Sequence, residues 1–260
     1  MHILVTFAID AEFSQWKSRH PFVPYEFDES GKRRDFDLFR ARIGSSEVTV
    51  LLTGMGSENA RNAMGSISLE RPDLLISTGL AGALDAALHP GDIVVARTSV
   101  VNDRSLKTES DAGLLDLAAQ AGALVVNVFL TSETIVATAR EKQLLSVSGS
   151  VVEMETTYVL AEAVRRQVPA VAVRSISDTA EEDLPVDFQR IADSRGHVKV
   201  GGLLKELVLH PHRLPLLVRF GQQSRASSEA LADFLDRYIS LIAEKWLGAR
   251  TSDREEISAT

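Results

Sequence analysis

Short apolar runs rich in β-branched residues alternate with longer segments of helical period along the first 180 residues of the chain. This alternation is typical of α/β folds, in which helices connect the strands of a substantially parallel sheet. The expected strands are Ile3–Ala8, Val48–Thr53, Leu74–Thr78, Asp92–Val101, Val125–Leu130, Val151–Met154 and Ala170–Ser177. The expected helices are Ser57–Glu70, Ala112–Ala121, Val136–Ser146 and Thr156–Gln167. Ligands of such sheets bind at the carboxyl ends of the strands.

The rest of the chain contains a charged loop and a helical C-terminal part. Residues Arg19–Arg42, with two prolines and a glycine, are expected to form an exposed loop that leads into a short strand. The periodicity fades over Asp183–His197, and Val198–Leu209 and Leu214–Trp246 are expected to be helices. A chain of 260 residues allows one large domain or two small ones. We expect one domain over residues 1–250, with a core at 1–180, a helical extension at 181–250 and a flexible tail at 251–260.

The composition excludes several classes of protein and site. The absence of cysteine excludes disulfides, thiolate metal sites and a cysteine nucleophile. The net charge of −8 argues against non-specific binding of nucleic acid, which requires a basic surface. No apolar run is long enough for a transmembrane helix, and the apolar N-terminus lacks a basic segment and ends at Asp10. We therefore expect a cytoplasmic protein that acts on a small molecule, with no metal and no cofactor.

Acidic residues stand at or just after the ends of three expected strands, at Glu12, Glu155 and Asp178. Alternation along the strand puts Glu153 on the same side as Glu155. Two carboxylates so close require a cation, a hydroxyl-rich ligand or a raised pKa. An aspartate at a strand end can act as a general acid if its surroundings raise its pKa. The alternatives are a helix N-terminal role for Glu155 and an N-cap role for Asp178. The convergence of three acids at one edge predicts an active site.

Two glycine-containing turns also follow expected strands. The first, Gly54–Asn59, begins like a dinucleotide fingerprint, but Asn59 replaces its third glycine, which argues against a nicotinamide cofactor. The backbone amides of this turn either bind an anionic ligand or have only a structural role in the turn. The second, Ser77–Leu84, is rich in small residues that permit either close approach of a ligand or close packing of a helix on the sheet.

These segments, in this order, resemble the purine nucleoside/uridine phosphorylase superfamily, and within it the nucleosidase branch typified by methylthioadenosine/S-adenosylhomocysteine nucleosidase. The resemblance spans about residues 1–180. It rests on Ala8–Glu12, Thr53–Gly56, Thr78–Gly82, Gly91–Val95, Val152–Glu155 and Arg174–Asp178. It implies a three-layer α/β/α fold with a twisted, mixed, largely parallel central sheet and a helical C-terminal extension, and we expect a homodimer.

A closer likeness is to the hopanoid-associated phosphorylase-like proteins, which are thought to remove adenine from adenosylhopane. It is carried by Gly79–Asp85, Val136–Lys142, Asp183–Pro185 and His210–Pro215.

The superfamily resemblance implies roles for the acidic residues and their neighbours. Asp178 would protonate N7 of a departing purine. Glu12 would position or deprotonate the attacking water, with Arg174 nearby. Met154 and Glu155 would hold the ribose, with Glu155 on its 2′ and 3′ hydroxyls. Glu153 is the second acid of the same strand end and is counted with them as a substrate-binding residue.

Four further residues are expected to line the substrate site. Val136 and Gly82 would offer backbone contacts to the base pocket. Ile135 matches a position that stacks on the base as an aromatic residue, and an isoleucine cannot stack in this way. Leu80 stands where the methylthioadenosine enzymes have a serine at the water site. Both departures argue against methylthioadenosine itself as the substrate.

The expected reaction is cleavage of the N-ribosidic bond of a 5′-substituted adenosine or related purine nucleoside. This bond breaks through an oxocarbenium-like sugar, which calls for a leaving-group acid and anionic stabilisation. The superfamily's phosphorylases carry a glycine-and-arginine phosphate motif where Asp10-Ala11-Glu12 stands here, so we expect water rather than phosphate as the co-substrate. Two alternatives stay open, a phosphate-dependent purine nucleoside phosphorylase and a non-catalytic nucleoside-binding or storage protein.

The start of the last expected helix is both apolar and basic. Its apolar residues are Leu214, Leu216, Leu217, Val218 and Phe220, and they lie among Arg213, Arg219 and Arg225. This face either packs on the core or a second subunit or makes weak contact with a lipid or an anionic membrane surface.

Overall fold

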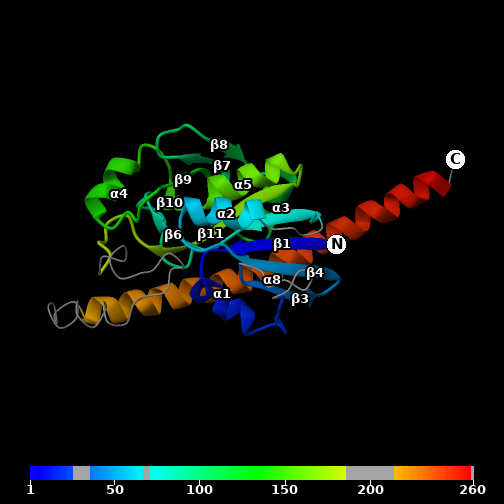
Figure 1. Ribbon diagram of the computed structural model, residues 1–260, viewed down its shortest axis with the longest axis horizontal. Helices are drawn as coiled ribbons and strands as arrows, with labels where there is room; N and C mark the ends of the chain where they lie inside the picture. The colour runs from blue at the N-terminus through cyan, green and yellow to red at the C-terminus, as the bar shows by residue number, and fades with distance from the viewer. Residues whose placement is uncertain (26–35, 67–70, 186–213, 259–260) are drawn as a thin grey trace.

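A computed structural model describes residues 1–25, 36–66, 71–185 and 214–258, with side chains up to residue 246. Its strands are β1 (His2–Phe7), β2 (Val23–Pro24), β3 (Leu38–Ile43), β4 (Ser46–Leu52), β5 (Leu74–Ser77), β6 (Leu80–Ala83), β7 (Ile93–Val101), β8 (Lys107–Glu109), β9 (Leu124–Thr131), β10 (Val151–Glu153) and β11 (Ala170–Asp178). The described helices are α1 (Asp10–Lys17), α2 (Ser57–Ser66), α3 (Ala112–Gln120), α4 (Ala139–Leu145), α5 (Thr156–Arg165) and α8 (Leu214–Ser258). Figure 1 shows their arrangement.

The strands form one mixed sheet in the order β2-β3-β4-β1-β5-β11-β6-β10-β9-β7-β8. Parallel ladders join β1 to β4 and β5, β11 to β5 and β6, and β9 to β7 and β10. The other ladders are antiparallel. The α/β class and the mixed sheet are therefore as expected from the sequence, although antiparallel pairs are more numerous than a largely parallel sheet implies.

Part of the sheet closes on itself, a feature that the expected three-layer α/β/α arrangement does not include. Strand β7 pairs with β9 and also, antiparallel, with β11. The strands β11, β6, β10, β9 and β7 thus form a ring. β11 makes this possible, because it is nine residues long and buried throughout, and its first part pairs with β5 while its second part pairs with β6 and β7. Long twisted strands that change partners along their length are what allow a sheet to curl into a barrel.

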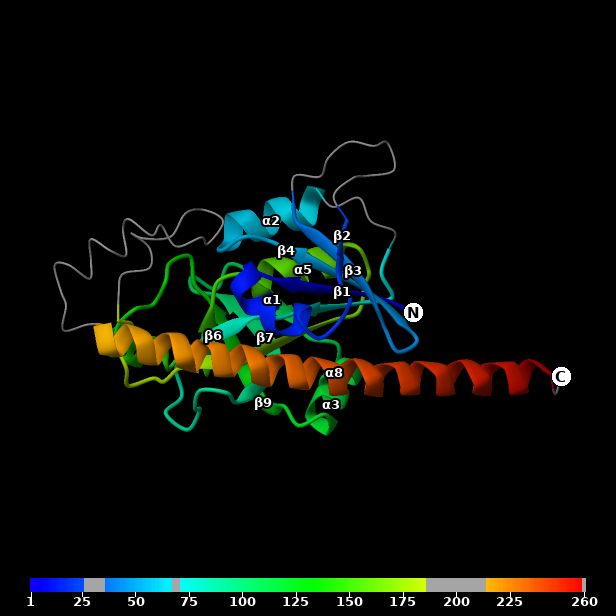
Figure 2. The ribbon, with the colours of Figure 1, turned by 90° about the horizontal axis from the view of Figure 1, so that it is seen from below.

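Helices cover both faces of the sheet, as Figure 1 shows for α2 and α5 on one side and α1 and α8 on the other. Alternate residues of β1 point to the two sides, with Val5 and Phe7 in one hydrophobic core and Leu4 in the other. The first core also takes in apolar residues of α3 and α8. Figure 2 shows α8 lying along this face and running past the rest of the chain at its C-terminal end.

Helix α1 was not expected from the sequence. It buries Phe13 and Trp16 in an aromatic cluster with Phe7, Phe22 and Phe39. The indole nitrogen of Trp16 donates a hydrogen bond to Asp236 of α8 at 2.7 Å. Because only two residues of this eight-residue helix are buried, its apolar pattern is too sparse to mark it. Tertiary contacts with α8 stabilise it instead.

Several other boundaries differ from the expected ones. Strands β6 and β8 were missed, because β6 consists of small residues and β8 is three residues long. The expected exposed loop at residues 19–42 contains β2 and most of β3. Helix α8 is continuous to Ser258 and so includes residues 251–258 of the expected tail. The expected helix Val198–Leu209 lies outside the described residues. Within the part of the chain that was described, no helix is long and apolar enough to span a membrane.

Candidate active site

The expected acids lie together in a cavity of about 200 Å³ beside the carboxyl ends of β1, β10 and β11. The cavity is lined by Ala8, Ile9, Glu12, Met55, Leu80, Ala81, Gly82, Thr134, Ile135, Val136, Val152, Glu153, Met154, Glu155, Ser177, Asp178, Leu184 and Phe220. Every site residue proposed from the sequence lies in this lining except Arg174. Among the described residues, no group of three or more His, Cys, Asp or Glu side chains is placed to hold a metal ion.

Glu12 enters the cavity from the first turn of α1. Its Oε1 accepts a hydrogen bond from the Leu80 amide at 2.8 Å, and its Oε2 accepts one from the Ala8 amide at 3.0 Å. Burial raises the pKa of the Glu12 carboxyl, and these amides and the charge of Arg174 act in the opposite direction. A carboxyl with a raised pKa is a better acceptor of a proton near neutral pH.

Gly79 explains why the carboxylate of Glu12 can come so close to the neighbouring strand. Its φ of +144° disfavours other residue types, and a Cβ atom at this position would lie 2.8 Å from Oε1 of Glu12. The glycine therefore makes room for a side chain of the protein itself, and the small-residue turn after β5 has a role at the site.

Glu155 lies at the start of α5, opposite the Gly54–Gly56 turn. Its Oε1 accepts a hydrogen bond from the amide of Gly56 at 2.7 Å. The glycine turn thus binds a carboxylate of the chain. Burial, and then the neighbouring negative charge of Glu153, raise the pKa of Glu155 to about 8. Met154 directly precedes Glu155 in the chain, and its Cε lies 3.8 Å from the position that a Cβ atom of Gly56 would occupy.

Glu153 and Arg174 form an ion pair beneath the cavity. Their side chains are 1% and 2% exposed, and Arg174 Nη2 lies 2.9 Å from Glu153 Oε2. The same carboxylate oxygen accepts hydrogen bonds from the amides of Glu155 at 2.9 Å and Thr156 at 2.7 Å. Arg174 also donates to the hydroxyl of Thr156 at 2.7 Å. This network fixes the turn that carries Met154 and Glu155, and the guanidinium itself is not part of the cavity lining.

Asp178 lies at the end of β11 and is 7% exposed. Its Oδ1 accepts a hydrogen bond from the Ser177 hydroxyl at 2.6 Å, and its Oδ2 accepts one from the Lys142 ammonium at 2.5 Å. Gly82 is its partner in the ladder with β6, and a Cβ there would lie 3.0 Å from Oδ2. A glycine is thus needed beside this carboxyl group. No helix begins after Asp178 in the described residues up to 185, so the N-cap alternative has no support there.

Apolar side chains form the other wall of the cavity. Ile135 and Val136 reach it from the connection between β9 and α4, Leu184 from the segment after β11, and Phe220 from α8. Phe220 is the aromatic residue among the described lining residues. The C-terminal extension therefore contributes to the site as well as to the core.

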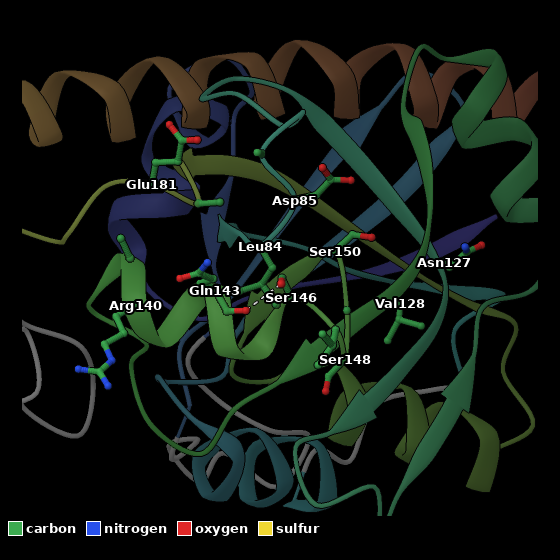
Figure 3. Close-up of a pocket in the computed structure, with 15 residues that line it drawn as sticks. Leu84, Asp85, Asn127, Val128, Arg140, Gln143, Ser146, Ser148, Ser150 and Glu181 are labelled. Atoms are coloured by element: carbon green, nitrogen blue, oxygen red, sulfur yellow. Dashed lines mark hydrogen bonds between the residues drawn. The ribbon is translucent and has the colours of Figure 1, made fainter.

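A larger hollow of about 880 Å³ lies beside α4 and contains none of the expected site residues. Figure 3 shows polar side chains around it, among them Asp85, Asn127, Gln143 and Ser146. It is separated from the acids described above, and nothing in its lining resembles a set of reacting groups.

Sequence reasoning missed Lys142 and Glu133. Lys142 is completely buried against Asp178, and Glu133 accepts hydrogen bonds from the hydroxyls of Ser57 and Tyr158. Lys142 lies within a helix, at the end of the Val136–Lys142 segment, and nothing in that pattern indicates a contact with Asp178. Glu133 comes two residues after β9, but it does not line the cavity that the other acids share.

Comparison with known proteins gives a consistent result. The profile of the family described as the phosphorylase superfamily matches residues 3–208. A 5′-methylthioadenosine/S-adenosylhomocysteine nucleosidase of Staphylococcus saprophyticus is 25% identical over 176 residues, which are 58% of this chain and 77% of that protein. Two solved structures share the fold. The 5′-methylthioadenosine/S-adenosyl homocysteine nucleosidase of Helicobacter pylori, with a bound pyrrolidine compound, has a TM-score of 0.69 at 19% identity and covers 92% of this chain and 98% of its own. The futalosine hydrolase of the same organism has a TM-score of 0.65 at 18% identity, with coverages of 91% and 97%.

Proposed function

The chain belongs to the phosphorylase superfamily, and we propose that it is a nucleosidase that hydrolyses the N-ribosidic bond of a 5′-substituted adenosine and releases adenine. The observation that carries this proposal is the meeting of Glu12, Glu155 and Asp178 in one cavity. Relatives named as nucleosidases of methylthioadenosine and S-adenosylhomocysteine support the reaction class.

In the proposed reaction, each acid has a separate task. As the bond between C1′ and N9 breaks, its electron pair moves into the purine, and Asp178 gives its proton to N7. Glu12 takes a proton from the water that attacks C1′. The 2′ and 3′ hydroxyls of the ribose donate to Glu155, and such hydrogen bonds favour its charged form over the neutral one that burial favours in the free protein.

The charges around the cavity support hydrolysis over phosphorolysis. The charged residues in its described lining are Glu12, Glu153, Glu155 and Asp178, with no arginine or lysine among them. None of the described lining residues offers a cation to a phosphate dianion, and desolvation of that dianion without one is unfavourable in a buried site. Water carries no such cost.

The apolar wall supports an apolar 5′ substituent, and adenosylhopane is a candidate of this kind. Phe220 belongs to α8, whose first turns leave Leu214, Leu216 and Val218 about half exposed. Of these, Leu216 lies one turn before Phe220 on the same face of the helix, so apolar side chains lead along that face from the cavity to the exterior, which suits a hydrocarbon group. The 5′ carbon of the substrate would then point toward Phe220.

The test is incubation of the purified chain with 5′-substituted adenosines, with and without phosphate, followed by chromatography. A nucleosidase releases adenine and the free ribose product without phosphate. Formation of a ribose 1-phosphate only in its presence would instead identify a phosphorylase. Binding without any release of adenine would identify a nucleoside-binding protein and refute the proposal.

A further inference from the structure

Lys142 is a buried charged residue that the reaction proposed above does not use. Its side chain is 0% exposed, on a helix whose neighbouring residues Arg140, Glu141 and Gln143 are exposed. Lysine is almost never fully buried unless its charge is paired, because desolvation of an ammonium costs several kcal/mol or more. The buried charge of Lys142 therefore requires a compensating partner, and its place in the interior calls for a functional explanation.

All three N–H donors of the ammonium are satisfied. Nζ donates to Oδ2 of Asp178 at 2.5 Å, to the carbonyl of Thr179 at 2.7 Å and to the carbonyl of Glu182 at 2.9 Å. An ammonium has three donors and no acceptor, so this set is complete. The cation is consequently fixed in position rather than free to swing into the cavity.

Helix α4 is itself fastened to the segment that follows Asp178. The Ala139 amide donates to the carboxylate of Asp183 at 2.7 Å, and the Leu184 amide donates to the carbonyl of Ala137 at 2.7 Å. A capping box between Thr138 and Glu141 closes the start of the helix. These bonds hold the helix, and with it the base of the Lys142 side chain, against the end of β11.

Three acidic side chains of these elements have partners other than Lys142. The Glu141 carboxylate accepts from Thr138, the Glu182 carboxylate pairs with Arg219, and the Asp183 carboxylate accepts from Ala139. Among the described residues, Lys142 is the cation bonded to Asp178. Within the described part of the chain, the positive charge bonded to Asp178 therefore comes from this one side chain.

We propose that Lys142 is a positioning residue for the acid of the reaction: it holds the carboxyl of Asp178 toward the base and balances the negative charge that Asp178 acquires. This inference rests on the proposed function. In the step concerned, the O–H bond of Asp178 breaks and the N7–H bond forms, while the electron pair of the C1′–N9 bond enters the purine. Asp178 is left as a carboxylate beside an ammonium that keeps its three protons. A fixed charge placed where charge develops stabilises the transition state.

The proposal is tested with Lys142→Met, which keeps the length of the side chain and removes the charge. For adenine release from a 5′-substituted adenosine, kcat should fall about 10²-fold or more, the usual contribution of positioned proton transfer. For 4-nitrophenyl β-riboside, whose phenolate leaves without a proton, kcat should stay within about threefold of wild type. A residue that only supported the fold would slow both substrates alike.

The pH profile gives a second readout. Removal of the positive charge beside the acid of the reaction should move the alkaline limb of the kcat profile to higher pH in Lys142→Met, whereas a residue with only a structural role should leave that limb in place. Arg140→Met removes the same charge from an exposed position of the same helix, and its rates and profile should match those of wild type. If Lys142→Met does not fold, as judged by circular dichroism, Lys142→Gln keeps a hydrogen-bond donor without the charge and should behave in the same way.

The outcomes separate the two proposals. If wild type releases no adenine from any 5′-substituted adenosine, the proposed function fails. If wild type does release adenine, and the lysine variants lose equal activity on both substrates or keep an unshifted profile, the role of Lys142 fails while the function stands.

Discussion

The strongest quantitative consequence of the site concerns Glu155 and the stability of the fold. Its pKa is raised from the ordinary value of 4.5 to about 8 by burial and by Glu153. Between these two pH values, the folded chain binds a proton at this position that the unfolded chain has lost. The free energy of unfolding therefore decreases as pH rises through this interval and is constant with respect to this group above and below it.

One proton contributes about 1.4 kcal/mol per pH unit, so the full interval corresponds to an upper value of about 5 kcal/mol. Relaxation around the buried charge reduces this, and we expect at least about 2 kcal/mol. Glu155→Gln removes the titration while its amide oxygen can still accept from Gly56. Relative to wild type, this variant should gain stability between pH 5 and pH 9, because wild type alone has to bury the carboxylate.

Urea unfolding of both proteins at pH 5, 7 and 9 measures this difference, and the comparison cancels the titration of all groups common to the two chains. A gap that stays constant with pH would show that Glu155 is ionised in the folded protein throughout. A constant gap would therefore contradict the electrostatic argument.

Four further predictions concern the cavity and residues close to it. Asp178→Asn should reduce adenine release by about 10²–10⁴-fold in a chain with unchanged circular dichroism, and near-normal turnover would exclude Asp178 as the acid. Gly79→Ala should lower the free energy of urea unfolding by about 1–3 kcal/mol and also lower kcat, because the new Cβ meets Glu12 in a backbone conformation that alanine rarely adopts; a variant of wild-type stability and rate would contradict this. Phe220→Glu should reduce kcat/KM for an adenosine with a long hydrocarbon 5′ group more than for methylthioadenosine. The double variant Leu217→Glu, Phe220→Glu should co-sediment less with liposomes than wild type. If neither chain binds liposomes, the lipid interpretation is refuted.

The sequence predicts the acids of the site better than it predicts the sheet. Residues at or after strand ends are brought together by any α/β topology, so Glu12, Glu155 and Asp178 could be placed at one edge without knowing the strand order. The closure of the sheet depends on the pairing of β11 with β7 as well as with β5 and β6. The local sequence of a strand does not determine which other strands it pairs with. Lys142 was missed for a similar reason, because its partner lies 36 residues away and no other residue of its helix is fully buried.

The distribution of charge in the site is informative about what it binds. Two of its four carboxylates have their own cations, since Glu153 is paired with Arg174 and Asp178 with Lys142. The other two, Glu12 and Glu155, have amide donors instead, and theirs are the carboxyl groups whose pKa values burial raises. Such groups are stabilised as anions by a positive charge that arrives between them. An oxocarbenium-like ribose supplies that charge only as the N-ribosidic bond breaks, so the interaction is stronger in the transition state than with the bound nucleoside. The pair without cations therefore adds to the acceleration that Asp178 supplies by proton transfer, and replacing both Glu12 and Glu155 by glutamine should lower kcat by a larger factor than it raises KM.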